Sequence, residues 1–260
     1  MGEHTINPIF NVLNTHKKMN IINPYRFGGG WSPKDLTNII SYCRSWEGLN
    51  KTGTAVDSLD DLTGNGFSWA ATGTNKPSFD GIDNIGGVDA IRFSGNTNEL
   101  LANVTMTYAD SSEAGYFIVF EITDAVSGGG YHNIFILNVL TGASAGSNFL
   151  QFYNPNTSAN FINNYPNNAY DSTITEGSQF NSSLAVCRKV TGQADYYLNG
   201  TETVKTSAGT NNVFSLNQNY IGSWGGNNSK MLLCEFGVFD TMSDAELLLL
   251  ESYVNTKYGI

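Results

Sequence analysis

The sequence predicts an all-β protein, an antiparallel jelly-roll sandwich with one α-helix at the C-terminal end. Two observations carry this prediction. Runs rich in β-branched and aromatic residues, such as Tyr116–Ile122 (YFIVFEI), are bounded by Gly and Asn clusters, which is typical of strands separated by turns. The last eighteen residues (SDAELLLLESYVNTKYGI) carry instead the spacing and the end signals of a helix.

The first thirty residues are predicted to form an arm outside the main core. Scattered apolar residues are mixed with Asn here, and the stretch ends in Tyr25, Arg26 and Phe27 followed by three consecutive glycines, which make a flexible joint. Residues 1–27 lack the continuous apolar core and the cleavage site of a secretory signal. We therefore expect an arm at residues 1–30 and one sandwich domain at residues 31–260.

Strands and turns alternate through the body of the chain. In its first half, Asp60–Gly66 is a tight turn, and Ala90–Phe93 is a strand that enters a second turn at Ser94-Gly95. The clearer strands come later: Tyr116–Ile122, Asn133–Leu140, Phe149–Tyr153, Leu184–Val190, Asp195–Leu198, Thr201–Lys205 and Met231–Phe239. Many strands at turn-rich spacing indicate a sandwich or jelly roll.

Two of these strands carry further information. Asn199-Gly200 separates two strand-like runs, and it is the strongest short hairpin signal because both residues tolerate positive φ. In the last run, simple alternation places four apolar residues on one face of a half-buried strand: Leu232, Cys234, Phe236 and Val238.

The C-terminal helix is predicted at residues 243–258. Ser243 is a suitable N-cap, and Glu246 three residues later completes a capping box. Gly259 is a suitable C-terminal stop. One face carries an apolar stripe that must lie against a larger body: Leu247, Leu250, Tyr253 and Val254.

Composition and charge exclude several functions. The formal net charge of −10 argues against a nucleic-acid partner. No run approaches the roughly 18 apolar residues of a membrane span. Cys43, Cys187 and Cys234 are odd in number, and the last two sit in apolar runs as buried free thiols. We expect synthesis in a reducing cytoplasm, even if the protein later works outside a cell.

In this order, these pieces resemble the concanavalin A-like lectin/glucanase superfamily, and within it the laminin-G-like domains of bacterial and phage surface proteins. The most specific match is Glu235–Ile260 (EFGVFDTMSDAELLLLESYVNTKYGI), which is similar to the close of that family. Shorter matches are Ser58–Gly66 (SLDDLTGNG), Ile91–Gly95 (IRFSG), Tyr116–Glu121, Tyr196–Gly200 (YYLNG) and Tyr220–Gly222 (YIG). The chain departs from the family at Leu59, where the first turn usually has Trp.

The resemblance implies a sandwich of two antiparallel sheets with a glycan-binding or a purely structural role. The stretch Asn23–Phe27 (NPYRF) with its glycines is also similar to the leader that precedes such domains in tailed-phage virion proteins. This implies that the arm docks on a capsid or tail protein through Tyr25, Arg26 and Phe27. Aromatic residues and Arg are typical interface anchors.

The sequence contains no recognisable catalytic constellation. Superfamily members that hydrolyse β-glucans carry an E-x-D-x-E strand, which sets two carboxyls about 5–5.5 Å apart, and this chain has none. There is no G-x-S-x-G nucleophile elbow. The histidines, His4, His16 and His132, have no zinc-ligand spacing. We therefore predict a protein that is not an enzyme.

Sugar binding in such folds uses an aromatic ring against the sugar's apolar face, with amides nearby for its hydroxyls. Trp224 is the best candidate, because glycines flank its loop and Asn227 and Asn228 follow. Tyr131 and Tyr165 lie in similar polar loops. The alternative for Trp224 is a loop residue folded over the sandwich edge or packed on a neighbouring subunit.

A structural calcium ion is the one cofactor that the sequence suggests. Asp80, Asp83 and Asp89 crowd one glycine-rich loop, and carboxylate oxygens are suitable ligands for this ion. Their spacing does not match an EF-hand, and Asx turns explain the same residues equally well.

These observations predict a non-enzymatic phage virion protein, a head fibre or surface decoration that displays the sandwich and has weak glycan affinity. Its partners would be capsid or tail proteins, further copies of itself in a dimer or trimer, and a glycan. The alternative is a dedicated lectin or adhesin that recognises one glycan. A polysaccharide depolymerase would need a carboxylate pair assembled from separate strands.

Overall fold

The computed structural model describes residues 30–72, 74–96, 99, 101–103, 115–124, 131–138, 147–153, 158–163, 169–171, 182–190, 193–207, 218–224 and 227–260. The chain divides into Met1–Trp31 and Ser32–Ile260. The second unit contains every strand and helix described below. It begins with a short 3₁₀ turn, η2 (Pro33–Asp35).

One sheet of this unit has seven strands within the described residues. In spatial order they are β1 (Ile39–Arg44), β20 (Lys230–Phe239), β9 (Gly115–Ile122), β14 (Ser183–Val190), β15 (Gln193–Leu198) and β16 (Thr201–Ser207). The seventh, β7 (Ile91–Ser94), pairs with β20 beside β1, at Lys230–Leu233. All of these pairs are antiparallel.

A second antiparallel sheet has nine strands in the described part of the chain. In spatial order they are β13 (Ala169–Asp171), β12 (Ser158–Asn163), β11 (Ser147–Tyr153), β10 (Tyr131–Asn138), β17 (Gln218–Ile221), β8 (Leu101–Asn103), β4 (Ser68–Ala71), β3 (Ala55–Asp60) and β2 (Leu49–Thr52). Two small hairpins complete the strands: β5 (Asn84–Ile85) with β6 (Val88–Asp89), and β18 (Ser223–Trp224) with β19 (Asn227–Asn228).

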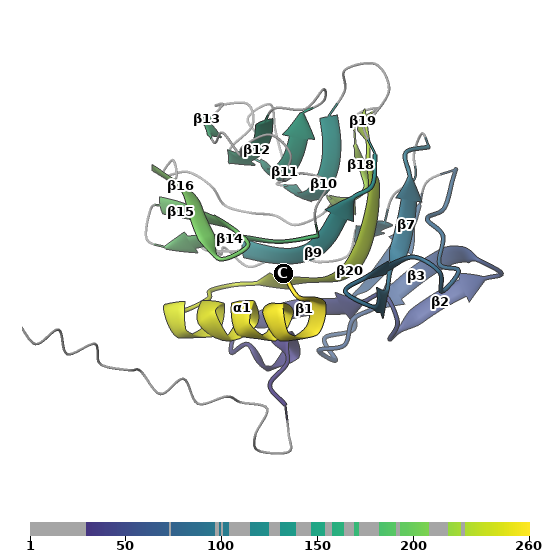
Figure 1. Cartoon of the computed structure of the whole chain (residues 1–260), viewed down its shortest axis with the longest axis horizontal. Helices are drawn as coiled ribbons and strands as arrows, with labels where there is room; N and C mark the ends of the chain where they lie inside the picture. Colours follow the sequence, from purple (N-terminus) through teal and green to yellow (C-terminus); the bar gives the residue numbers. More distant parts are fainter. Residues whose placement is uncertain are drawn as a thin grey trace, which may run out of the picture. The chain divides into compact units, whose positions relative to one another are not determined.

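The predicted antiparallel sandwich with a C-terminal helix is therefore confirmed. The helix α1 (Asp244–Tyr258) lies along the outer face of the β20–β9 sheet, as Figure 1 shows. Buried residues of both sheets form one core, and Trp69 of β4 meets Phe236 of β20 edge to face at 4.8 Å. Leu59 is 1 % exposed and belongs to this core.

The alternation predicted for β20 is wrong. The register against β9 shifts between Leu233 and Glu235, which is a β-bulge. A bulge adds one residue on one strand and reverses the faces beyond it. The residues that reach the inter-sheet core are therefore Met231, Leu233, Phe236 and Val238, whereas Leu232 and Cys234 do not belong to that core.

The helix begins and ends where the sequence predicts. The Glu246 backbone N–H donates to Ser243 Oγ at 3.3 Å, and Glu246 Oε2 accepts from the Ser243 N–H at 2.9 Å. Glu246 Oε1 also accepts from the Thr37 N–H at 2.9 Å, so the cap ties the helix to the chain before β1. Gly259 has a φ of +74°, the left-handed conformation of a helix stop. The helix buries Leu247, Leu250, Tyr253, Val254 and Tyr258.

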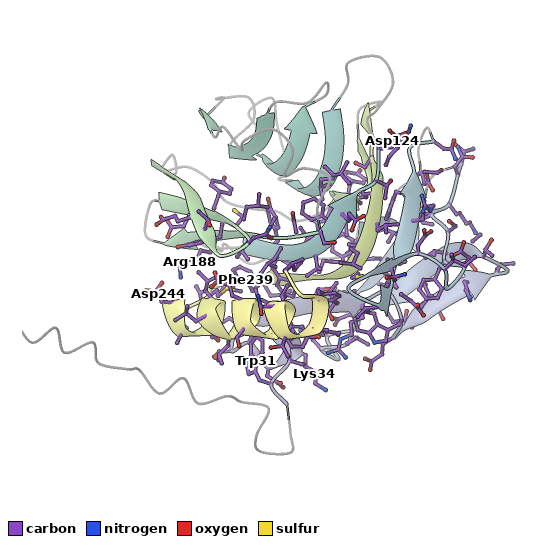
Figure 2. The ribbon with its side chains drawn as sticks, in the orientation of Figure 1. Trp31, Lys34, Asp124, Arg188, Phe239 and Asp244 are labelled. Atoms are coloured by element: carbon purple, nitrogen blue, oxygen red, sulfur yellow. The ribbon has the colours of Figure 1, made fainter. Side chains whose placement is uncertain are left out.

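The N-terminal end of the helix is also held by an ion pair. Arg188 of β14 and Asp244 lie next to each other in Figure 2, with Nη1 and Oδ1 2.6 Å apart. Arg188 is buried, and its Nη2 group donates a hydrogen bond to the Tyr197 hydroxyl at 2.8 Å. A carboxylate in the first helical turn is favourable for the helix dipole as well.

A buried carboxylate joins the C-terminal half of the helix to the sheet. Glu235 of β20 is fully buried, and its Oε1 accepts from the hydroxyls of Tyr253 and Tyr258 at 2.7 Å each and from Lys257 Nζ at 2.5 Å. Its Oε2 accepts from the Tyr42 hydroxyl at 2.8 Å. We call these five residues the Glu235 cluster.

The surroundings of the Glu235 cluster suit this arrangement. Burial, and then the Glu235 charge, raise the pKa of the Tyr42, Tyr253 and Tyr258 hydroxyls, so all three stay protonated donors. Burial lowers the pKa of Lys257, and the attraction of Glu235 opposes this effect.

Trp46 covers the Glu235 cluster and does not belong to the inter-sheet core. Lys257 Nζ lies 3.9 Å from the centre of its ring, and the Arg44 guanidinium lies 5.5 Å from it. Both contacts have cation–π geometry. Trp46 is half-buried, whereas Trp69 is fully buried.

Glu235→Gln should destabilise the protein by about 3–5 kcal/mol, because it leaves Lys257 in a half-buried site without its counter-charge. Urea unfolding at pH 7 measures this. The control is the double variant Glu235→Gln/Lys257→Met, which removes both charges and should recover part of the loss. A double variant that is no more stable than Glu235→Gln would contradict the coupling.

Protonation of the Glu246 carboxylate should lower the free energy of unfolding in acid. Burial alone would raise its pKa, but hydrogen bonds from Ser243 and Thr37 lower it to about 2. The unfolded value is about 4.3, so the stabilisation is complete above that pH and is lost as the pH falls towards 2. Glu246→Gln should cost about 1 kcal/mol at pH 7 and flatten the pH profile of urea unfolding between 5 and 2. A profile as steep as that of the parent would contradict this assignment, and Glu202→Gln, at an exposed strand position, is the control.

Candidate functional site

The residues predicted to bind sugar fall mainly at one end of the second sheet. Trp224 lies in β18 and pairs with Asn227 of β19, and Ser223 pairs with Asn228. This stretch was predicted as a loop, and the structure has it as a short hairpin, β18–β19. Tyr131 begins β10, and Tyr165 lies outside the described residues.

The chain path brings the β18–β19 hairpin and the start of β10 together. Ile221 of β17 pairs with Phe135 of β10, and the chain then continues past Gly222 into β18. Because the strands run antiparallel, continuing in this direction leads towards Tyr131. Strands β18 and β19 both contact β10, and Figure 1 shows the three side by side. Trp224, Asn227 and Asn228 therefore share one edge with Tyr131.

Gly222 fixes the base of this hairpin. Its φ is +98°, and a Cβ at this position would overlap the ring of buried Phe93 and lie 3.0 Å from the Glu99 carbonyl oxygen. The Ser229 N–H donates to the Gly222 carbonyl at 2.7 Å and closes the hairpin. The hairpin thus leaves the core at a point where only glycine fits.

Glu99 supports the same region from the neighbouring loop. It is 3 % exposed, and its Oε2 accepts from the Ser94 N–H and hydroxyl at 2.8 Å and from the Asn96 N–H at 3.2 Å. Burial raises the pKa of Glu99, and these hydrogen bonds oppose the rise. The sequence analysis noted Gly222 only as a glycine that flanks the Trp224 loop and did not identify Glu99. No local sequence signal marks Glu99.

Three carboxylates in or next to strands of the first sheet, Glu121, Asp124 and Glu235, are engaged in structural contacts. Glu235 is fully buried within the Glu235 cluster, so a substrate cannot reach its carboxylate. Glu121 accepts from the Ser182 hydroxyl at 2.6 Å, and Asp124 pairs with Lys230 at 2.9 Å. A general acid or base must reach the reacting group, which the position of Glu235 prevents.

The three aspartates weighed as calcium ligands have separate roles. Asp83 forms a two-pronged ion pair with Arg92. Asp80 Oδ1 accepts from the Ile82 N–H at 2.9 Å, which is an Asx turn. Asp89 lies in β6 and is exposed. Within the described ranges, no group of three or more His, Cys, Asp or Glu side chains is arranged to hold a metal ion.

The remaining predictions concern the arm and the thiols. Tyr25, Arg26 and Phe27 lie outside the described residues, so their anchoring role stays a prediction. Cys187 and Cys234 are free and buried, as expected, and Cys43 is also free and buried. Burial raises the pKa of Cys234 to about 12 and that of Cys43 as well, so neither thiol is activated. Among the helices that the structure describes, none has the length and apolar character to cross a membrane.

Comparison with solved structures assigns the fold. A sialidase of Trypanosoma rangeli aligns with 91 % of this chain and 35 % of its own, with a TM-score of 0.61 and 9 % identity. The receptor-binding domain of botulinum neurotoxin D aligns with 83 % of this chain and 52 % of its own, with a TM-score of 0.57 and 13 % identity. The serotype D ligand-binding domain in complex with N-acetylneuraminic acid aligns similarly, with a TM-score of 0.58 and 14 % identity.

These neighbours share a lectin-like β-sandwich with this protein. The chain spans about a third of the sialidase chain and about half of the neurotoxin chains. The fold thus occurs both in an enzyme chain and in a receptor-binding domain. No family model and no curated protein matches the sequence.

Gly222→Ala should destabilise the domain by about 1–3 kcal/mol more than Gly87→Ala does, because its methyl group overlaps Phe93. Gly87 is the matched control, since it has a φ of +82° and no atom within 4 Å of an added Cβ. Urea unfolding of both variants measures the difference. Equal losses would show that the contact with Phe93 is not what fixes the hairpin.

Proposed function

We propose that the Ser32–Ile260 unit is a carbohydrate-binding domain without catalytic activity. The observation that carries this proposal is the edge where Trp224, Asn227 and Asn228 lie on a hairpin against the strand that begins with Tyr131. An aromatic ring and neighbouring amides are what a sugar's apolar face and hydroxyls require. The fold adds support, since one neighbour is described as a ligand-binding domain in complex with N-acetylneuraminic acid.

The charge of the chain narrows the expected ligand. A net charge of −10 repels anionic partners over the range of the Debye length. We therefore expect neutral glycans to bind more tightly than sialylated ones, even though sialic acid is the sugar in the neurotoxin complex.

Trp224→Ala tests the proposal on a glycan array followed by titration of the best ligand. Loss of the ring should weaken binding about tenfold or more, equivalent to about 1.4 kcal/mol. Ile82→Ala is the control, because Ile82 is an exposed apolar residue in another loop and is 78 % exposed. If the parent protein bound no glycan on the array, or if Trp224→Ala bound as tightly as the parent, the assignment of this edge would be overturned.

The finer proposal is that the domain is displayed on a phage particle. It rests on the sequence resemblance and on the arm that precedes the sandwich, with Tyr25, Arg26 and Phe27 as anchors to a capsid or tail protein. A decoration or head-fibre role in a homodimer or homotrimer would present several weak glycan sites at once, which raises the overall avidity. In this proposal the protein is made in the host cytoplasm and acts on the virion surface.

Deleting residues 1–30 tests the display role. The shortened protein should keep its glycan affinity and its unfolding free energy but should no longer enter particles, measured by immunoblotting of purified virions. Triple replacement of Tyr25, Arg26 and Phe27 by Ala is the narrower variant. Incorporation at the parent level in both cases would contradict anchoring by the arm.

A further inference from the structure

A polar groove lies away from the β18–β19 hairpin, where the C-terminal half of α1 meets the turn between β15 and β16. Its volume is about 360 Å³, which is large enough for one or two sugar rings. Helix residues on one wall face the turn Asn199-Gly200 on the other, and the residues used below are Asn199, Gly200, Leu248, Glu251, Ser252 and Asn255.

The turn that forms one wall is rigid. Asn199 and Gly200 have φ values of +49° and +74°, which matches the predicted tight hairpin. Asn199 N–H donates to the Leu184 carbonyl at 2.9 Å, and Asn199 Oδ1 accepts from the Leu184 N–H at 2.8 Å. The Asn199 side chain is exposed. With Oδ1 engaged, its Nδ2 group remains as a donor for a ligand.

Glu251 provides the acceptor on the opposite wall. A Cβ at Gly200 would lie 3.5 Å from the Glu251 carboxylate, so the absence of a side chain at Gly200 leaves that carboxylate open to the groove. Glu251 is half-buried, and it forms no hydrogen bond or ion pair with any residue that the structure describes. Burial raises its pKa, and the charge of Arg188 opposes the rise. A half-buried carboxylate without hydrogen-bond donors is costly unless a ligand or water supplies them.

The rest of the lining determines what kind of ligand fits. Ser252 and Asn255 add a hydroxyl and an amide, each of which donates and accepts. Leu248 adds an apolar surface and is 61 % exposed, one of only two large apolar side chains so exposed in the described part of the chain. No described lining residue is basic. A protonated amine would satisfy Glu251 but would leave the donors of the groove without acceptors, whereas a sugar diol satisfies both.

The geometry points to this groove as a second carbohydrate subsite, specific for a neutral pyranose with two adjacent hydroxyl groups. Glu251 would accept from the two hydroxyls, Asn199 Nδ2 would donate to one of them, and Leu248 would cover the apolar face of the ring. An anionic sugar such as a sialic acid would be repelled by the same carboxylate. This inference rests on the proposed carbohydrate-binding function but uses different residues.

Titration of ¹⁵N-labelled protein with methyl glycosides of neutral hexoses and of N-acetylneuraminic acid tests the subsite. Neutral glycosides should shift the amide signals of Gly200 and Ser252, with the neutral sugar at least tenfold tighter than the sialic acid. Glu251→Gln should weaken neutral-sugar binding at least fivefold. Glu202→Gln is the matched control, because it removes the same charge at an exposed strand position and should leave the binding unchanged.

The outcomes separate the two proposals. Groove shifts that need at least fivefold more sugar in Glu251→Gln but are unchanged in Trp224→Ala support the second subsite, and groove shifts that are unchanged in Glu251→Gln overturn it. Neutral-sugar binding that depends on Trp224 alone, without groove shifts, leaves the proposed function intact and overturns the subsite. No response to any sugar overturns both. Groove shifts with a methylated lysine derivative but not with sugars would show a cation site instead, which also overturns the inference.

Discussion

The Glu235 carboxylate is the group on which the arrangement of helix and sheet depends. It is fully buried on the outer face of the sheet, so the chain must supply it with hydrogen-bond donors. Tyr253, Lys257 and Tyr258 of the helix and Tyr42 of β1 do so. If the helix were rotated or shifted by one turn, the buried Glu235 carboxylate would lose its hydrogen-bond donors. The free-energy cost of this loss fixes the position of the helix on the sheet.

The attachment of the helix accounts for several residues of the C-terminal segment. Glu235, Tyr253, Lys257 and Tyr258 belong to the Glu235 cluster. Glu246 caps the helix and accepts from the Thr37 N–H. The opposite face of the same helix does not take part in the Glu235 cluster. Glu251 and Leu248 lie on that face, across the groove from the Asn199-Gly200 turn.

Local sequence signals predicted the helix and the strands β7, β9, β10, β11, β14, β15, β16 and β20. They did not predict most of the other strands or how the elements meet. The capping box at Ser243 and the hairpin at Asn199-Gly200 depend on neighbouring residues only, and both are found as expected. The alternation in β20 failed because the bulge at Leu233–Glu235 arises from its pairing with β9, which is distant in sequence. The groove was missed for a similar reason, since its two walls are about fifty residues apart.

The sequence by itself determined the antiparallel sandwich, the ends of its helix, the buried state of its thiols and the candidate sugar-binding residues around Trp224. These follow from hydrophobic period, turn chemistry and caps, which act over a few residues. Only the tertiary structure decided that Glu235 is a structural charge, that Gly222 must be a glycine because Phe93 lies against it, and that Glu251 faces a groove. Each of these three findings depends on which residues pack against the side chain. Contacts between residues that are distant in sequence cannot be predicted from a local sequence pattern.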